Sequence, residues 1–203
     1  MDEMDKDFWN DACRKDPSQV NVADRFLGAE IQDLEPGTAL DLGCGSGTNA
    51  LKLAEQGWSV IGVDWAQHAI ELATKAATEH GLNATFVVGD ITEWQPPHQF
   101  DLVINTYALP GGDMSRRTLE TAAAALANGG TLIVVEWDRS MSEVWGFRED
   151  ELLTPEQIVT LLPGLEIEKA EVRHVEDAFS SPDDPRGSKG SAANVAFVRA
   201  RKR

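Results

Sequence analysis

TALDLGCGSGTNALKLAEQGWSVIGVD, residues 38–64, begins with an apolar run that breaks into three glycines within five residues. A helical pattern follows, and a second apolar run then stops at an acid, Asp64. This order predicts a strand, a glycine turn, a helix and a parallel strand, the βαβ unit that opens nucleotide-binding α/β domains. Glycines let the backbone approach a ligand closely, and the next helix offers free N–H groups to a carboxylate or phosphate. Asp64, at the end of the second strand, is placed to accept ribose hydroxyls.

The spacing of the glycines distinguishes two kinds of nucleotide site. A dinucleotide fingerprint is G-x-G-x-x-G, but Thr48 occupies the place of its third glycine. The string DLGCGSG, residues 41–47, instead gives G-x-G-x-G with an acid before the first glycine. A carboxylate there repels a pyrophosphate and suits the ammonium group of an amino acid. The string resembles motif I of the class I S-adenosylmethionine (SAM)-dependent methyltransferases.

The resemblance implies a set of cofactor contacts. The glycine turn with Asp41 would hold the methionine end of SAM, and Asp64 the ribose. An acid and an apolar residue after the third strand would meet the adenine. The residues implied to bind the cofactor are Asp41, Gly43, Cys44, Gly45, Gly47, Asp64, Trp65, Asp90, Ile91 and Asn105. Two of them have plain structural alternatives, since Trp65 could pack under the next helix and Asp90 could cap a helix or turn.

The rest of the chain predicts an α/β fold with further strands and intervening helices. The expected strands are 38–42, 59–63, 85–88, 100–104, 131–136, 165–175 and 194–199. The run VAFV, residues 195–198, is apolar on both faces, so this strand should be interior to the sheet. By resemblance, the fold is the Rossmann-like class I methyltransferase fold: a seven-stranded, mostly parallel sheet with a reversed last strand and helices on both faces.

Two regions are expected within one structural domain. Residues 1–36 should form an N-terminal helical cap, whose second helix runs from about residue 21 to 34. Residues 37–203 should form the SAM-binding core. The cap could simply cover one edge of the sheet, or it could close over the cofactor with Phe8 and Trp9.

The composition limits the kinds of partner that we expect the protein to bind. The formal net charge is −16 over 203 residues, so most of the surface would repel DNA or RNA. The two cysteines form no C-x-x-C pair, no apolar run reaches about 18 residues, and the N-terminus has no signal-peptide core. We therefore expect a cytoplasmic protein with a small-molecule substrate, no nucleic-acid or membrane partner, and a homodimer as an open option.

The chain also resembles a subgroup, the small bacterial methyltransferases of the tellurite-resistance TehB type. Relatives of that type tend to carry histidines after the fourth strand and at the end of the fifth. This sequence has Tyr107 at the first place and Glu136 to Asp138 at the second, so the substrate is not carried over.

The catalytic candidates follow from the kind of acceptor. A soft, ionised nucleophile needs no general base, whereas a hydroxyl or ammonium group does. The candidates are Tyr107, Glu136 and Asp138, with His174 as a further titratable group. No metal is expected, because the four histidines show no ligand spacing. Two other functions stay open: a catalytically silent SAM-binding regulatory or scaffold protein, and an NAD-linked oxidoreductase, which Thr48 and Asp41 disfavour.

Overall fold

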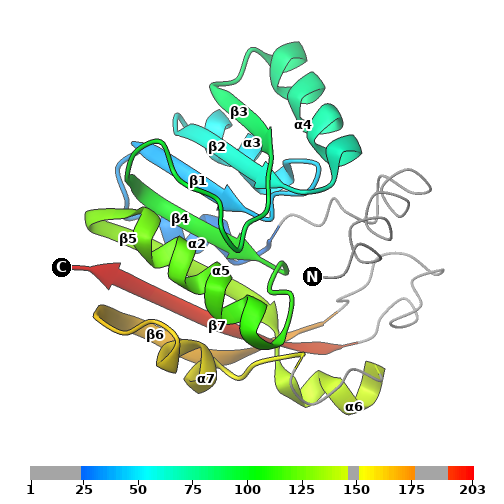
Figure 1. The fold of residues 1–203 in the computed structure, drawn as a ribbon, viewed down its shortest axis with the longest axis vertical. Coiled ribbons are helices and arrows are strands. Elements are labelled where there is room, and N and C mark those ends of the chain that lie inside the picture. Colours follow the sequence, from blue (N-terminus) through cyan, green and yellow to red (C-terminus); the bar gives the residue numbers. More distant parts are fainter. Residues whose placement is uncertain (1–23, 146–150, 177–191) are drawn as a thin grey trace.

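The computed structural model describes residues 24–145, 151–176 and 192–203, and these form one seven-stranded sheet with helices on both faces (Figure 1). The order of the strands across the sheet is β3-β2-β1-β4-β5-β7-β6. β7 runs antiparallel to both β5 and β6, while the other neighbouring strands pair in parallel. This confirms the predicted fold class, including the reversed last strand. The strands are β1 (Thr38–Leu42), β2 (Ser59–Asp64), β3 (Ala84–Val88), β4 (Phe100–Thr106), β5 (Leu126–Trp137), β6 (Leu165–Val175) and β7 (Ala193–Lys202).

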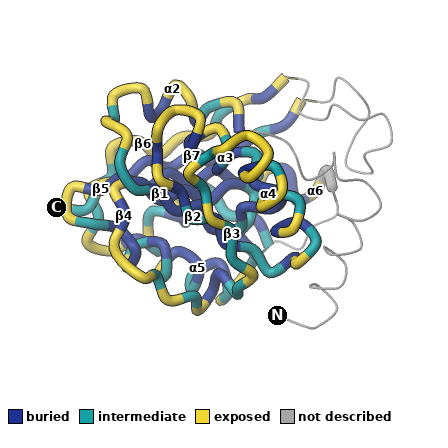
Figure 2. The backbone as a smooth tube through the Cα atoms, turned by 90° about the horizontal axis from the view of Figure 1, so that it is seen from above, coloured by how far each residue is buried: buried dark blue, intermediate teal, exposed yellow. Residues whose placement is uncertain are grey.

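The sheet separates two apolar clusters. α5 and α7 pack on one face, and α2 and α3 on the other, while α4 lies against β2 and β3 (Figure 1). Successive residues of a strand face opposite clusters, as Ala39 and Leu40 do in β1. The inner strands are therefore apolar on both faces and buried, as Figure 2 shows for β1 and β2. The helices are α2 (Leu27–Ile31), α3 (Thr48–Glu55), α4 (Gln67–His80), α5 (Gly112–Ala125), η2 (Arg139–Met141), α6 (Ser142–Trp145) and α7 (Pro155–Thr160).

β5 begins earlier than its sequence pattern predicts. Local rules place the end of α5 at the run Asn128-Gly129-Gly130, yet the helix stops at Ala125 and strand pairing starts at Leu126, opposite Phe100. The pairing of β4 with β5 then shifts in register between Phe100 and Leu102, and the glycines allow this shift. Gly129 has a φ of +81°, and a Cβ on Gly130 would lie 2.8 Å from the carbonyl oxygen of Phe100. The glycines therefore permit an irregular strand entry, a role that local helix-stop rules miss.

The N-terminal region is described only from residue 24 onward, so Phe8 and Trp9 lie outside the described residues. Within the described part of the predicted helix, α2 runs only from Leu27 to Ile31, and the Asp24 carboxylate accepts hydrogen bonds from the N–H groups of Phe26 and Leu27 at its start. α7 begins with a capping box: Thr154 accepts from the Gln157 N–H, and the Gln157 side chain accepts from the Thr154 N–H.

Candidate functional site

The glycine turn joins β1 to α3 at the carboxyl edge of the sheet. Gly43, Gly45 and Gly47 have φ values of +79°, +52° and +84°, which side chains strain to adopt. A Cβ on Gly43 would collide with the Cβ of Ala108. A Cβ on Gly47 would lie 2.8 Å from the ring of Phe86. The turn therefore requires glycine at these two positions, and it brings the segment after β4 directly beside it.

Asp41 lies on β1, just before the turn, and it is 1% exposed. Neither of its carboxylate oxygens has a partner at normal hydrogen-bond length among the described residues, and the Ala50 N–H is the backbone donor that faces them. Burial, and next the nearby charge of Asp64, raise the pKa of Asp41 to about 7. A buried carboxyl group without a donor destabilises the protein, unless a cation or donor from outside satisfies it.

Asp64, at the end of β2, closes the turn from the other side. Its two oxygens accept hydrogen bonds from the N–H groups of Gly45 (2.9 Å) and Ala66 (2.8 Å). Burial raises its pKa, and these backbone donors oppose that rise. Each carboxylate oxygen has a second lone pair, so Asp64 can still accept hydroxyl groups while it fixes the turn.

The remaining adenine-side residues surround the ends of β2 and β3. Trp65 is half-buried and packs on Ala66 and Ala69, which is the structural alternative considered for it. Asp90 accepts from both the N–H and the hydroxyl of Thr92, so it also shapes a turn. Ile91 is buried in the cluster beneath α5. These contacts leave the predicted cofactor roles untested.

Two further predicted residues are buried at the same edge. Asn105 donates to the Leu42 carbonyl (2.8 Å) and thereby ties β4 to β1, while its side-chain oxygen has no partner among the described residues. Cys44 is a buried free thiol whose pKa is raised by burial and by the charges of Asp41 and Asp64. A thiol of this kind acts as a small apolar residue rather than as a nucleophile.

Tyr107 follows β4 with a φ of +53°, the one left-handed non-glycine residue in the described part of the chain. Its N–H donates to the Val135 carbonyl (2.7 Å), and its ring lies 4.6 Å from that of Trp137. Burial, followed by the charges of Asp24 and Glu136, raises the pKa of its hydroxyl far above the usual range. Tyr107 therefore keeps its proton at neutral pH and does not act as a base by itself.

Glu136 and Asp138 lie at and after the end of β5, and both are buried. The Glu136 carboxylate accepts from the N–H groups of Leu109 and Trp137, and burial raises its pKa to about 7. Asp138 caps η2 by accepting from the Ser140 N–H. Both candidates thus have structural duties as well. His174 lies on the edge strand β6, beside Asn194.

Sequence reasoning missed three polar residues that the structure brings to this edge: Asp24, Asn49 and Thr106. Asn49 accepts from the Asp24 N–H and donates to the Thr106 hydroxyl, both at 2.9 Å. All three are buried. Buried polar residues would have pointed to these three positions, but the sequence does not show which positions become buried.

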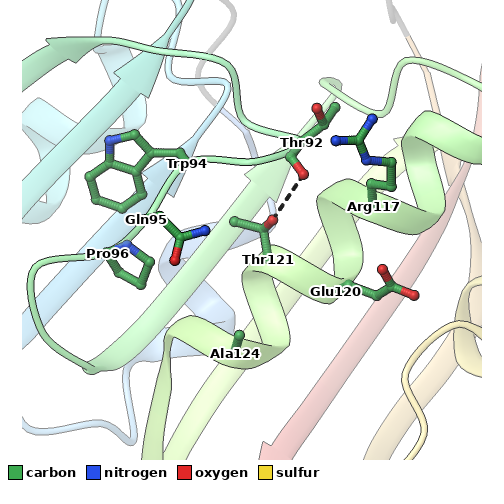
Figure 3. Close-up of a pocket in the computed structure, with 8 residues that line it drawn as sticks. All are labelled: Thr92, Trp94, Gln95, Pro96, Arg117, Glu120, Thr121 and Ala124. Atoms are coloured by element: carbon green, nitrogen blue, oxygen red, sulfur yellow. Dashed lines mark hydrogen bonds between the residues drawn. The ribbon is translucent and has the colours of Figure 1, made fainter.

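A pocket of about 250 Å³ lies elsewhere, between the β3–β4 connection and α5 (Figure 3). Its wall includes the hydrogen bond from the Thr121 hydroxyl to the Thr92 carbonyl. The lining residues are Thr92, Trp94, Gln95, Pro96, Arg117, Glu120, Thr121 and Ala124. None of the predicted site residues lines this pocket, so we assign no ligand to it. Within the described ranges, no cluster of three metal-ligating side chains is found, and no helix is long and apolar enough to cross a membrane.

Comparisons with known proteins bear on this geometry. Residues 39–130 match the family model of a methyltransferase domain. One curated relative is a 2-heptyl-1-hydroxyquinolin-4(1H)-one methyltransferase of Mycobacteroides abscessus, 35% identical over 51% of this chain and 48% of its own. Another is the ribosomal RNA small subunit methyltransferase C of Alcanivorax borkumensis, 31% identical over 50% of this chain and 32% of its own. The chain thus spans half or less of the length of these relatives.

Solved structures support the same fold. TehB from Haemophilus influenzae superposes with a TM-score of 0.75 at 18% identity, covering 89% of this chain and 63% of that one. At this identity the likeness shows the fold alone.

Proposed function

We propose that the chain transfers a methyl group from SAM to a small-molecule acceptor, because residues 39–130 match the family model of a methyltransferase domain. SAM supplies a methyl group on a sulfonium, already a good donor, so the protein contributes mainly by binding and orienting both partners.

The observation that carries this proposal is the Asp41 carboxylate. It is buried beside the glycine turn, and the Ala50 N–H faces it, but neither of its oxygens has a donor at normal hydrogen-bond length among the described residues. The amino-acid ammonium group of SAM would supply that charge and those donors. A dinucleotide pyrophosphate would instead bring negative charge against Asp41 and Asp64, which argues against the NAD-linked alternative.

The other cofactor contacts belong to the same proposal. Gly43, Cys44, Gly45 and Gly47 would line the methionine end, with Asn105 beside them after β4. Asp64 would accept the ribose hydroxyls with its remaining lone pairs. Trp65, Asp90 and Ile91 would surround the adenine. Residues 1–36 would form the cap over a core of residues 37–203.

A small-molecule acceptor is favoured over a nucleic acid on charge. One relative is named as a ribosomal RNA methyltransferase, but the net charge of −16 here opposes binding to a polyanion. The quinolone methyltransferase gives the precedent of a small acceptor. A cytoplasmic location is part of the proposal, and a homodimer is the assembly to test first.

Titration calorimetry with S-adenosylhomocysteine (SAH), SAM and NADH tests the proposal. We expect saturable binding of SAH and SAM and none of NADH. Asp64→Ala should weaken SAH binding by roughly tenfold or more, because it loses the ribose contacts and two backbone hydrogen bonds. Asp101→Ala is the matched control, since Asp101 accepts from Thr38 at the start of β1 rather than at its end. If SAH does not bind, the proposal is wrong.

A SAM-binding protein without transfer activity is the second candidate. It is favoured by the duties of Glu136 and Asp138, whose carboxylates already accept backbone N–H groups. Formation of a methylated product from any acceptor would exclude it.

A further inference from the structure

Tyr107 belongs to a chain of contacts that joins three separate elements. The Asp24 N–H donates to Asn49 in the first turn of α3, and Asn49 donates to Thr106 at the end of β4. Thr106 precedes Tyr107, whose hydroxyl and the Asp24 carboxylate influence each other's pKa without a hydrogen bond of normal length between them. Tyr107, with its left-handed φ of +53°, directly follows this set of contacts along the chain. Such strain, of order 1–3 kcal/mol, persists only where the surroundings fix it, and it clusters at functional sites.

The Asp24 carboxylate is suited to more than capping α2. Its Oδ1 atom accepts from the N–H groups of Phe26 and Leu27. Its Oδ2 atom is buried and has no partner at normal hydrogen-bond length among the described residues. The residue is 5% exposed. An oxygen in this state is available to a proton.

The segment after β4 also lies where an acceptor would be needed. Ala108 contacts the glycine turn at Gly43, and Asn105 is bonded to Leu42 in front of it. Tyr107 lies between these two contacts along the chain. A ligand held on the turn therefore has Tyr107 in the neighbouring segment.

We propose that Asp24 positions the Tyr107 hydroxyl and takes its proton, so that the Tyr107 oxygen can remove a proton from the methyl acceptor. The acceptor is then a compound whose nucleophile carries a proton, an alcohol, phenol or amine, rather than a soft anion. This inference rests on the proposed methyl transfer. The proton count balances: the nucleophile loses one proton to the Tyr107 oxygen, the tyrosine proton passes to Asp24 Oδ2, and the carboxylate becomes a neutral acid.

The surrounding charges are consistent with this direction of transfer. Burial raises the pKa of Asp24, which makes its carboxylate a better proton acceptor than an exposed one. Glu136 is a second carboxylate whose charge acts on Tyr107, and Arg25 and Arg173 are nearby cations. Arg173 is bound to Glu30 and Glu171, so it shares its charge with other carboxylates.

The first test uses the fact that Tyr107 is the single tyrosine of the chain. The full chain labelled with 3-fluorotyrosine gives one fluorine resonance, followed by NMR from pH 4 to pH 9. We expect two titration steps, from Asp24 and Glu136. Asp24→Asn should remove one step and Glu136→Gln the other, while Asp33→Asn, an exposed carboxylate on the same segment, should remove neither. Asparagine still accepts from the α2 N–H groups, so the fold is retained. An unchanged titration in Asp24→Asn overturns the inference.

The second test measures transfer of labelled methyl from SAM to two pools, one of alcohols, phenols and amines, the other of thiols and tellurite. We expect product from the first pool and a loss of about 100-fold in Asp24→Asn, with SAH affinity kept. Product from the second pool alone would overturn the inference and leave the proposed function standing. SAH binding without product from either pool would count against both, and loss of SAH binding in the wild type would refute the proposed function itself.

Discussion

Replacing Asp41 by asparagine is expected to stabilise the ligand-free protein at pH 8. The wild-type carboxyl group is buried, and neither oxygen has a donor at normal hydrogen-bond length among the described residues. Burial first, and then the charge of Asp64, raise its pKa from 3.8 to about 7, against the Ala50 N–H, which lowers it. At pH 8 the native state therefore holds a poorly solvated charge that the unfolded chain exposes to water. Asparagine keeps the shape of the side chain and removes the charge.

The size and the sign of this change in stability follow from proton linkage. Between pH 3.8 and pH 7 the native state binds a proton that the unfolded state has lost. Stability from this group is thus fully present below pH 3.8 and lost as the pH rises through 7. The full shift of the Asp41 pKa, from 3.8 to about 7, corresponds to about 4 kcal/mol in the free energy of unfolding. The buried amide that Asp41→Asn introduces costs about 1–3 kcal/mol, so a net gain of about 1–3 kcal/mol is expected at pH 8.

Urea unfolding followed by tryptophan fluorescence at pH 5.5 and pH 8 measures the effect. For each pH, the free energy of unfolding of wild type is subtracted from that of Asp41→Asn. This difference should be about 2 kcal/mol larger at pH 8 than at pH 5.5. Asp33→Asn is the control: Arg199 lowers the pKa of Asp33, so its ionisation lies below both pH values. A difference for Asp41→Asn that is the same at both pH values would refute the assignment of a buried, unpaired carboxylate.

Three further outcomes follow from the site and the fold. Wild-type affinity for SAH should rise about 30-fold from pH 5.5 to pH 8, because the ammonium group binds ionised Asp41, and calorimetry in two buffers should detect the released proton. Gly47→Ala should destabilise the protein by about 2 kcal/mol or more and abolish SAH binding, since its φ is +84° and its Cβ would strike Phe86, and urea unfolding with calorimetry checks both. Thr154→Ala should cost about 1 kcal/mol in urea unfolding through loss of the α7 cap and leave SAH affinity unchanged.

Much of the fold was predictable because its signals are local. The alternation of apolar runs and glycines around residues 38–64 predicted β1, α3 and β2, and the two-sided apolar pattern of residues 195–198 placed β7 inside the sheet. The start of β5 was not predictable, because the pairing of Leu126 with Phe100 is a contact between distant segments. Local rules predict that a helix ends at the two glycines, residues 129–130. The pairing of Leu126 with Phe100 instead makes these glycines part of β5.

The candidate site likewise contains residues that could be predicted from the sequence and residues that could not. Asp41 and the glycines could be found from their spacing, since each role depends on the local turn. The strained φ of Tyr107 and the burial of Asp24 depend on three elements that meet only after folding. The sequence therefore offered Tyr107 as a base, whereas its surroundings keep it protonated and direct attention to Asp24.

The place of β7 also determines the order in which the protein can be completed. β7 bonds to β5 and β6 on its two sides, and it follows both along the chain. A nascent chain thus exposes the edge of β5, and leaves β6 without its partner, until residues 193–202 have been synthesised. Strands left open in this way are prone to associate with other chains, and contacts so distant in sequence form slowly. β6 therefore joins the sheet only through β7, and the interval before β7 pairs with β5 is when the chain most needs protection from aggregation.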